Sequence, residues 1–142
     1  MKKVLFVILA MSATLIADAQ CRTFVKNNCG EAMGDYVPAE NFNAAKLLAG
    51  DEAEMNLTFY AGEDYRILVC THDILGDVQF KLIDEEGETL YDNSQNGFDP
   101  KFDFSVEGTR KLKIDINVPP SESRIRPQGC VAIMVGRLVD VN

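Results

Sequence analysis

Tryptophan is absent from the 142 residues of this sequence, and histidine occurs once, as His72. Since no C-x-x-C spacing accompanies the lone histidine, the chain lacks the usual ligands of a structural zinc site. Positive charge is scarce as well: 14 lysines and arginines stand against 22 aspartates and glutamates, a formal net charge of −8. Nucleic acids and anionic lipid head groups both require basic patches, so we expect neither as a partner.

Long apolar runs are also missing after the first 16 residues. The one such run, residues 4–16, follows a basic start and precedes the small-residue motif Ala17-Asp18-Ala19. It is shorter than the ~20 residues that cross a bilayer, and the three parts together are typical of a secretory signal peptide. We therefore predict that residues 1–19 are a signal peptide of bacterial style, cleaved after Ala19. The protein would then be exported, periplasmic or extracellular, and not embedded in a membrane.

The sequence contains four cysteines, an even number. All four cysteines (Cys21, Cys29, Cys70 and Cys130) follow the predicted signal peptide. An even number of cysteines in an exported chain indicates disulfides, and four cysteines allow three pairings. We predict that Cys21 pairs with Cys29, closing a short loop, and that Cys70 pairs with Cys130, joining strands far apart in sequence.

From residue 53 onward, apolar residues alternate with polar ones. Met55, Leu57 and Phe59 form the first series. Later series, separated by turn-rich stretches, occupy residues 65–69, 78–82, 88–93, 101–106 and 112–118. Short alternating strands of this kind are typical of an antiparallel sandwich.

We therefore predict an all-β fold, a jelly-roll-like antiparallel β-sandwich of about eight strands over residues 51–142. The last strand, residues 129–139, is apolar on both faces, so we place it at the centre of its sheet. Residues 118–129 contain three prolines and are predicted to be an irregular connection. Residues 20–50 are expected to cover the sandwich as an irregular or short-helical segment. Within them, residues 38–48 could form a short helix or lead into a first strand.

The turn motifs carry a family resemblance. The segments AGEDY (61–65) and LID (82–84), then Gly87, Leu90 and DN (92–93), are ordered as in the pre-peptidase C-terminal domain family. The chain resembles this family over roughly residues 53–136, although its cysteines and the segment VEGTRKLKI (106–114) depart from the family pattern. The resemblance implies a small β-sandwich that binds, spaces or assists without catalysing a reaction, and it names no ligand.

The loop of residues 92–103 is a candidate calcium site. Asp92, Ser94 and Asn96 fall at positions 1, 3 and 5 of the calcium-loop pattern, and Asp103 falls at position 12. However, the flanks read as strands rather than helices, and position 12 lacks the usual glutamate. We favour the alternative of a solvated hairpin loop, since Asn-Gly and Asp-Pro are ordinary turn sequences. We expect no cofactor, with calcium as the one candidate.

Two tyrosines are candidate ligand contacts. Tyr60 and Tyr91 would face outward if their neighbours Phe59 and Leu90 face inward. Exposed aromatic rings can stack on sugars, so the two residues could form a small platform for a carbohydrate. Packing at a sheet edge is the alternative role for both.

No catalytic set emerges from the sequence. Cys70 and His72 stand two apart on a predicted strand, which separates their side chains by ~7 Å, beyond the ~3 Å reach of a general base. We therefore predict a non-catalytic binding module whose ligand is a protein or a surface polysaccharide, with a monomer as the default state. The alternative is a structural component that pairs with a partner strand through a sheet edge.

Overall fold

The computed structural model describes residues 15–39 and 42–140. Residues 1–14, most of the predicted signal peptide, lie outside the described residues. The first described element is the helix α2 (Leu15–Asn28), which runs through the predicted cleavage position. Cleavage after Ala19 therefore stays a prediction.

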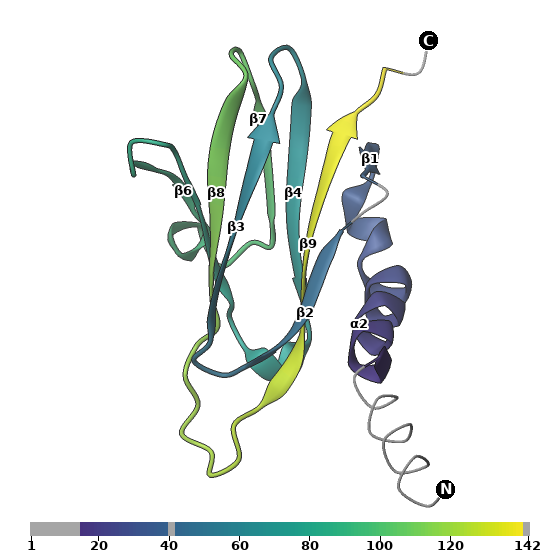
Figure 1. The fold of residues 1–142 in the computed structure, drawn as a ribbon, viewed down its shortest axis with the longest axis vertical. Helices are drawn as coiled ribbons and strands as arrows, with labels where there is room; N and C mark the ends of the chain where they lie inside the picture. Colours follow the sequence, from purple (N-terminus) through teal and green to yellow (C-terminus); the bar gives the residue numbers. More distant parts are fainter. Residues whose placement is uncertain (1–14, 40–41, 141–142) are drawn as a thin grey trace, which may run out of the picture.

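The described residues contain nine strands and three short 3₁₀ helices (Figure 1). The strands are β1 (Tyr36–Pro38), β2 (Asn43–Leu48), β3 (Glu52–Phe59), β4 (Asp64–Thr71), β5 (Gln79–Ile83), β6 (Thr89–Asp92), β7 (Lys101–Ser105), β8 (Arg110–Asn117) and β9 (Gln128–Leu138). The 3₁₀ helices are η1 (Gly30–Met33), η2 (Asp73–Leu75) and η3 (Asn93–Asn96).

The strands form two antiparallel sheets that pack as a sandwich. One sheet has the order β1-β9-β4-β7, with β2 also paired to β9 along the same side as β1. The other sheet has the order β3-β8-β5-β6. The predicted all-β sandwich is confirmed, and β9 occupies the predicted central position.

The core between the sheets explains the alternating sequence pattern. Inward residues of β8, for example Leu112, Ile114 and Ile116, are at most 2% exposed, while their neighbours along the strand face outward. The largest fully buried side chains of the core are Phe59 and Phe80. Burial of one face per strand is the physical cause of the period of two.

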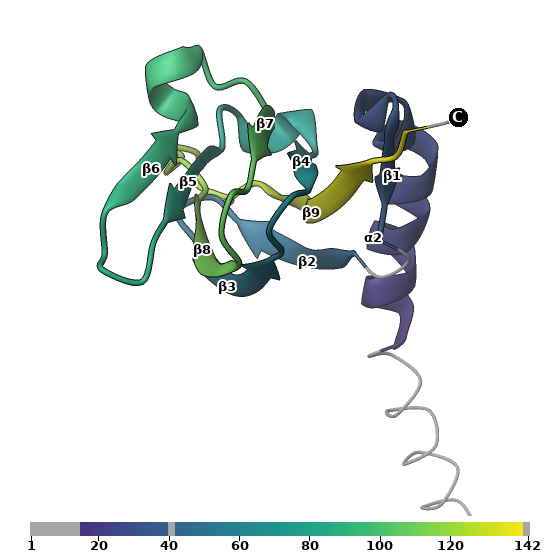
Figure 2. The ribbon, with the colours of Figure 1, turned by 90° about the horizontal axis from the view of Figure 1, so that it is seen from above.

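A second, smaller core lies on the outer face of the five-stranded sheet. The helix α2 covers this face (Figure 2). Val25 and Met33 pack there against Leu68, Ala132 and Met134. Strand β9 is therefore covered on both faces, by the other sheet and by the helix. This double burial is why its sequence is apolar throughout.

Both disulfides attach the helical segment to the sheet, so the predicted pairing is wrong. Cys21 bonds Cys130 of β9, and Cys29 bonds Cys70 of β4. Cys21 and Cys29 are eight residues apart along a helical segment, a rise of about 12 Å, whereas bonded cysteines need Cα atoms within about 7 Å. Cys70 lies opposite Ala132 rather than Cys130, which makes Cys70 and Cys130 diagonal neighbours, too distant for a bond.

The segment of residues 20–50 is more regular than expected. The helix of this segment ends at Asn28, and residues 43–48 form the strand β2 instead of a helix. All six β2 residues pair in register with β9, from Asn43 opposite Ile133 to Leu48 opposite Gln128. Strands β1 and β2 therefore belong to the sandwich, and only the helical part covers it. Pairing with β9 overrides the helical spacing of the apolar residues.

The proline-rich connection between β8 and β9 contains no helix or strand, as predicted. It is fixed at its end by Arg126, whose guanidinium donates hydrogen bonds to the carbonyl oxygen of Ala49 and pairs with Asp51 at 3.0 Å. This contact ties the connection to the turn between β2 and β3.

Candidate protein-binding groove

One open side of the sandwich lies between the β1–β2 edge of one sheet and the β3 edge of the other. A groove of about 470 Å³ lies there, next to β1 and the end of β3. Its floor is made of the core residues Leu57, Phe59, Tyr65 and Val135. The sandwich core therefore reaches the surface here through the half-buried Leu57 and Val135, and we call this hollow the β1–β3 groove.

The rim of the β1–β3 groove is apolar and exposed. Val37 is 57% exposed, Tyr60 61% and Val139 47%. One charged pair borders this apolar rim, the guanidinium of Arg137 and the carboxylate of Glu63 at 3.1 Å. Adjacent exposed apolar side chains above an apolar floor are a feature of interaction sites rather than of ordinary surface.

Hydrogen bonds fix the chain at the groove where β3 ends. The backbone N–H of Tyr60 donates to the hydroxyl oxygen of Tyr65 at 3.0 Å, and the N–H of Ala61 donates to the hydroxyl oxygen of Thr109. The Tyr65 ring packs edge-on against Phe59. The backbone of Tyr60 and Ala61 is thus fixed beside the groove floor, and the Tyr60 side chain lies at the rim.

A second hollow of about 280 Å³ lies further along the same open side, between β2 and β3. Core residues again line it, including Met55, Ile116 and Val131. The Nδ2 atom of Asn43 donates a hydrogen bond to the sulfur of Met55 and links the two strands there.

The two predicted tyrosine contacts have different surroundings. Tyr60 is exposed as predicted and lies at the groove rim. The outward orientation predicted for Tyr91 is wrong: its ring stacks on Phe102 at 3.9 Å and contacts Phe80, while its neighbour Leu90 is 42% exposed. The inner face of β7 offers an aromatic surface that accommodates this ring, and burial raises the pKa of Tyr91.

Three of the four candidate calcium ligands lie together, and the fourth, Asp103, lies in the other sheet. The carboxylate of Asp92 accepts hydrogen bonds from Ser94 and Gln79, and Asn96 donates to the carbonyl oxygen of Asp92. Burial alone would raise the pKa of Asp92, but the bonds from Ser94 and Gln79 hold it below its usual value. Asp103 lies on β7, in the other sheet, and its carboxylate is bound by Arg66.

The carboxylates of Asp92 and Asp103 are each held by other side chains, and calcium binding by this loop stays a prediction. Within residues 15–39 and 42–140, no three His, Cys, Asp or Glu side chains are grouped so that they could share a metal ion. The loop is instead a turn built around a buried Asn93, whose side chain bonds the backbone of Phe80 and Val78.

A more polar cleft of about 450 Å³ lies at the opposite end of the molecule. Glu52, Asp77 and Gln79 line it, together with Phe98 and two prolines. Phe98 has a φ of +56°, a conformation that a bulky residue rarely adopts. Its backbone N–H donates to the carbonyl oxygen of Asn93 at 2.9 Å, which holds the turn in this shape.

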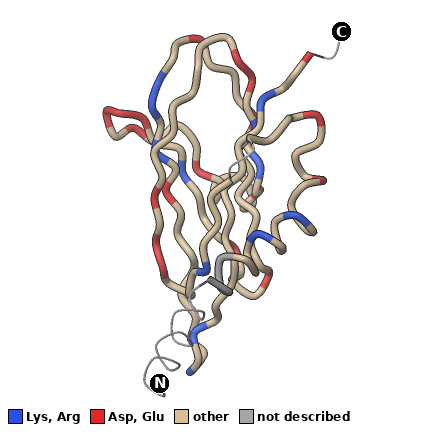
Figure 3. Tube along the Cα trace, turned by 45° about the vertical axis from the view of Figure 1, so that its right-hand side comes forward, with Lys and Arg blue, Asp and Glu red and all other residues tan. Residues whose placement is uncertain are grey.

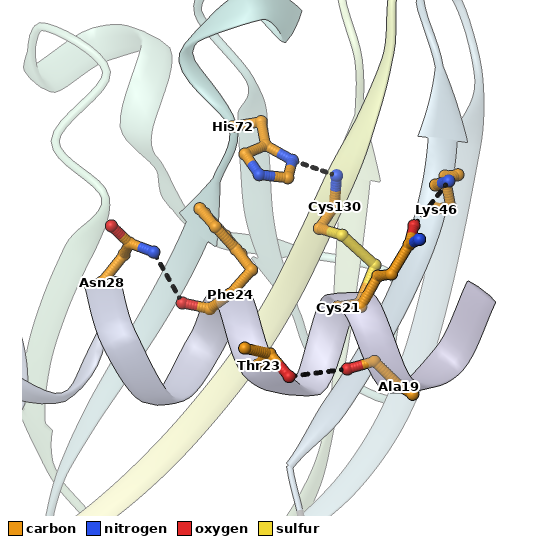
Figure 4. Close-up of a disulfide and its surroundings, with 9 residues drawn as sticks. Ala19, Cys21, Thr23, Phe24, Asn28, Lys46, His72 and Cys130 are labelled. Carbon is orange, nitrogen blue, oxygen red and sulfur yellow. Dashed lines mark hydrogen bonds between the residues drawn. A yellow bond between two sulfur atoms is a disulfide. The ribbon is translucent and has the colours of Figure 1, made fainter. Parts of the chain in front are cut away.

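His72 lies beside the Cys21–Cys130 disulfide and the helix α2. Its Nδ1 atom accepts a hydrogen bond from the backbone N–H of Cys130 at 2.7 Å, as Figure 4 shows. The ring of Phe24, on the helix α2, lies 3.9 Å from the His72 ring. The histidine therefore helps to seat the helix on the sheet.

Acidic and basic residues are interspersed along the turns, the strands and the helix α2 (Figure 3). Of the helices in the described part of the chain, none has the length and apolar character needed to cross a membrane.

Comparison with known proteins gives a likeness in fold. No protein-family model and no curated protein matches the chain. The fold is similar to the crystal structure of PliG from Aeromonas hydrophila, described as a periplasmic lysozyme inhibitor of g-type lysozyme. The match covers 72% of this chain and 87% of that chain, with a TM-score of 0.52 and 13% sequence identity. At this identity the likeness shows that the two chains share a β-sandwich fold.

Proposed function

We propose that this protein is an exported, non-catalytic module that binds a protein partner through the β1–β3 groove. The observation that carries the proposal is the exposure of Val37, Tyr60 and Val139 around a floor made of the sandwich core. Aromatic and aliphatic side chains in a partly desolvated hollow are the usual centre of a protein interface.

Export is supported by the disulfides and by the sequence of residues 1–19. Disulfides persist in oxidising compartments such as the bacterial periplasm, and all four cysteines are paired. The resemblance to pre-peptidase C-terminal domains supports the same kind of role, a secreted module without its own chemistry.

A secreted lysozyme is the first partner to test. The structural neighbour is described as an inhibitor of g-type lysozyme, and a shared fold makes a related partner a concrete starting point. The net charge of −8 favours association with a positively charged protein over an anionic polymer.

The experiment measures binding to g-type lysozyme, and inhibition of it, by calorimetry and a cell-wall lysis assay. We expect the Val37→Asp variant to bind at least about tenfold more weakly, because it places a charge on the apolar rim. Ile125→Asp is the matched control, since Ile125 is 86% exposed in the proline-rich connection, away from the groove. Equal binding by both variants would place the contact elsewhere. Binding to insoluble peptidoglycan but not to lysozyme would favour a polysaccharide ligand.

A further inference from the structure

The free edges of the two sheets are not equally protected. β1 has three residues and ends in Pro38, and β7 has five residues and follows Pro100. β6 has four residues, and its register with β5 shifts between Leu82 and Ile83. β2 packs against the helix α2 through Ala44. Short length, proline, a bulge and a covering helix are all devices that keep an edge strand from pairing with another chain.

The edge of β3 lacks these devices. It has eight residues without proline, and its register with β8 is unbroken from Glu52 opposite Asn117 to Phe59 opposite Arg110. Its inward residues Ala53, Met55 and Leu57 are half-buried and border the two hollows of the open side. β3 is thus the longest regular free edge in the described part of the chain, with apolar residues incompletely covered beside it.

The outer face of β3 restricts which strand can pair with it. Glu52 and Glu54 lie at one end of the strand, and the uncharged Asn56 and Thr58 lie at the other. In an antiparallel pair of two β3 strands centred on Met55, Glu52 faces Thr58 of the second copy and Glu54 faces Asn56. Centred on Asn56, the pair places Glu54 opposite Thr58. In both registers no like charges are opposite each other, and residues on the inner face meet apolar residues.

We propose that β3 of one copy pairs antiparallel with β3 of a second copy, which joins the two four-stranded sheets into one. The interface is isologous, because the same strand lies on both sides of a two-fold axis. Glu54 already forms an ion pair with Lys113 of its own chain at 3.5 Å, which reduces its repulsion of the second copy.

In the dimer, β3 of the second copy would border the β1–β3 groove. With the pair centred on Met55, Ala53 of the second copy lies opposite Leu57 on the groove floor. The turn between β2 and β3 of the second copy then lies beside the groove. The inference rests on the sheet edge and stands independently of the proposed partner.

Sedimentation velocity of the exported, oxidised protein from micromolar to millimolar concentration tests the dimer. We expect a reversible dimer that Asn56→Glu weakens about tenfold, since this change sets glutamates opposite each other in both registers. The weakening should diminish in 1 M NaCl, as screening predicts at a Debye length of about 3 Å. Within one chain the new glutamate faces Lys113, so the fold itself is not expected to suffer.

Asn27→Glu on the exposed face of α2 is the matched control and should leave the dimer unchanged. A wild-type protein that stays monomeric throughout this range would overturn the proposal. So would a dimer that Asn56→Glu and Asn27→Glu affect equally, because its interface would lie elsewhere. The groove variants Val37→Asp and Ile125→Asp test lysozyme binding separately.

Discussion

Arg66 of β4 and Asp103 of β7 lie directly opposite each other and form a two-pronged ion pair, Nε to Oδ1 and Nη2 to Oδ2, each at 2.7 Å. The remaining guanidinium nitrogen donates to the carbonyl oxygens of Ala32 and Met33. The guanidinium also lies over the ring of Tyr36 at 4.5 Å. One side chain thus fastens the segment after the helix α2 to the sheet.

Replacing Arg66 by lysine is expected to lower the free energy of unfolding by about 1–2 kcal/mol. Lysine keeps the charge but cannot hold the carboxylate through two parallel bonds and also reach both carbonyl oxygens. Thermal unfolding monitored by circular dichroism measures the loss. Arg124→Lys, at an exposed position, is the control and should unfold as the wild type does. An Arg66→Lys protein of wild-type stability would show that the two parallel bonds from Arg66 to Asp103 do not contribute to stability.

The same ion pair predicts a dependence of stability on pH. The hydrogen bond from Arg66 holds the pKa of Asp103 below its usual value, with burial acting in the opposite direction. A carboxyl group with a depressed pKa stabilises the fold above its unfolded pKa of about 3.9 and loses this contribution as the pH falls through its folded pKa. We expect the melting temperature to fall below about pH 4. The fall should be smaller in Asp103→Asn, and an identical fall in both proteins would contradict the assignment.

Non-reducing peptide mapping should recover Cys21 linked to Cys130, and Cys29 linked to Cys70. Trypsin separates all four cysteines, because a lysine or arginine lies between each successive pair. Replacing both Cys29 and Cys70 by serine should cost about 3–4 kcal/mol, since their disulfide closes a sequence separation of 41 residues. Recovery of Cys21 linked to Cys29 would contradict the observed topology.

Among the polar residues of the turn after β6, Asn93 is expected to lower the free energy of unfolding most when replaced by alanine. Its side chain is 1% exposed, accepts from the N–H of Phe80 at 2.8 Å and donates to the carbonyl oxygen of Val78 at 3.1 Å. Asn93→Ala leaves these buried groups without partners and should cost about 2–4 kcal/mol in unfolding free energy. Asn96→Ala, an exposed change in the same turn, should cost less than about 1 kcal/mol. Equal losses in chemical denaturation would contradict this role.

The sandwich was predictable because most of its strands bury one face, which makes apolar and polar residues alternate along the sequence. The central place of β9 was predictable for a related reason, since only a strand covered on both faces is apolar throughout. Residues 20–50 were harder to interpret. β2 pairs with a strand about 85 residues away, a contact that local spacing does not encode.

The groove was only partly predictable. Tyr60 was identified from alternation, but Val37 of β1 and Val139, just after β9, come together only in three dimensions. The orientation of Tyr91 was predicted wrongly because β6 is a short edge strand. Stacking on Phe102, rather than alternation from Leu90, sets the direction of the Tyr91 ring. The disulfide pairing was predicted wrongly because the helix α2 holds Cys21 and Cys29 too far apart to bond each other.

The connectivity of the two disulfides has a consequence for how the chain matures. A protein that enters an oxidising compartment from its N-terminus presents Cys21 and Cys29 together, long before Cys130 arrives. An oxidase that joins cysteines in order of appearance would link Cys21 to Cys29 and leave the helix detached from the sheet. Reaching the native bonds from that state requires thiol–disulfide exchange, which is slow without an isomerase. We therefore expect the yield of this fold to depend on the isomerase capacity of the compartment in which it forms.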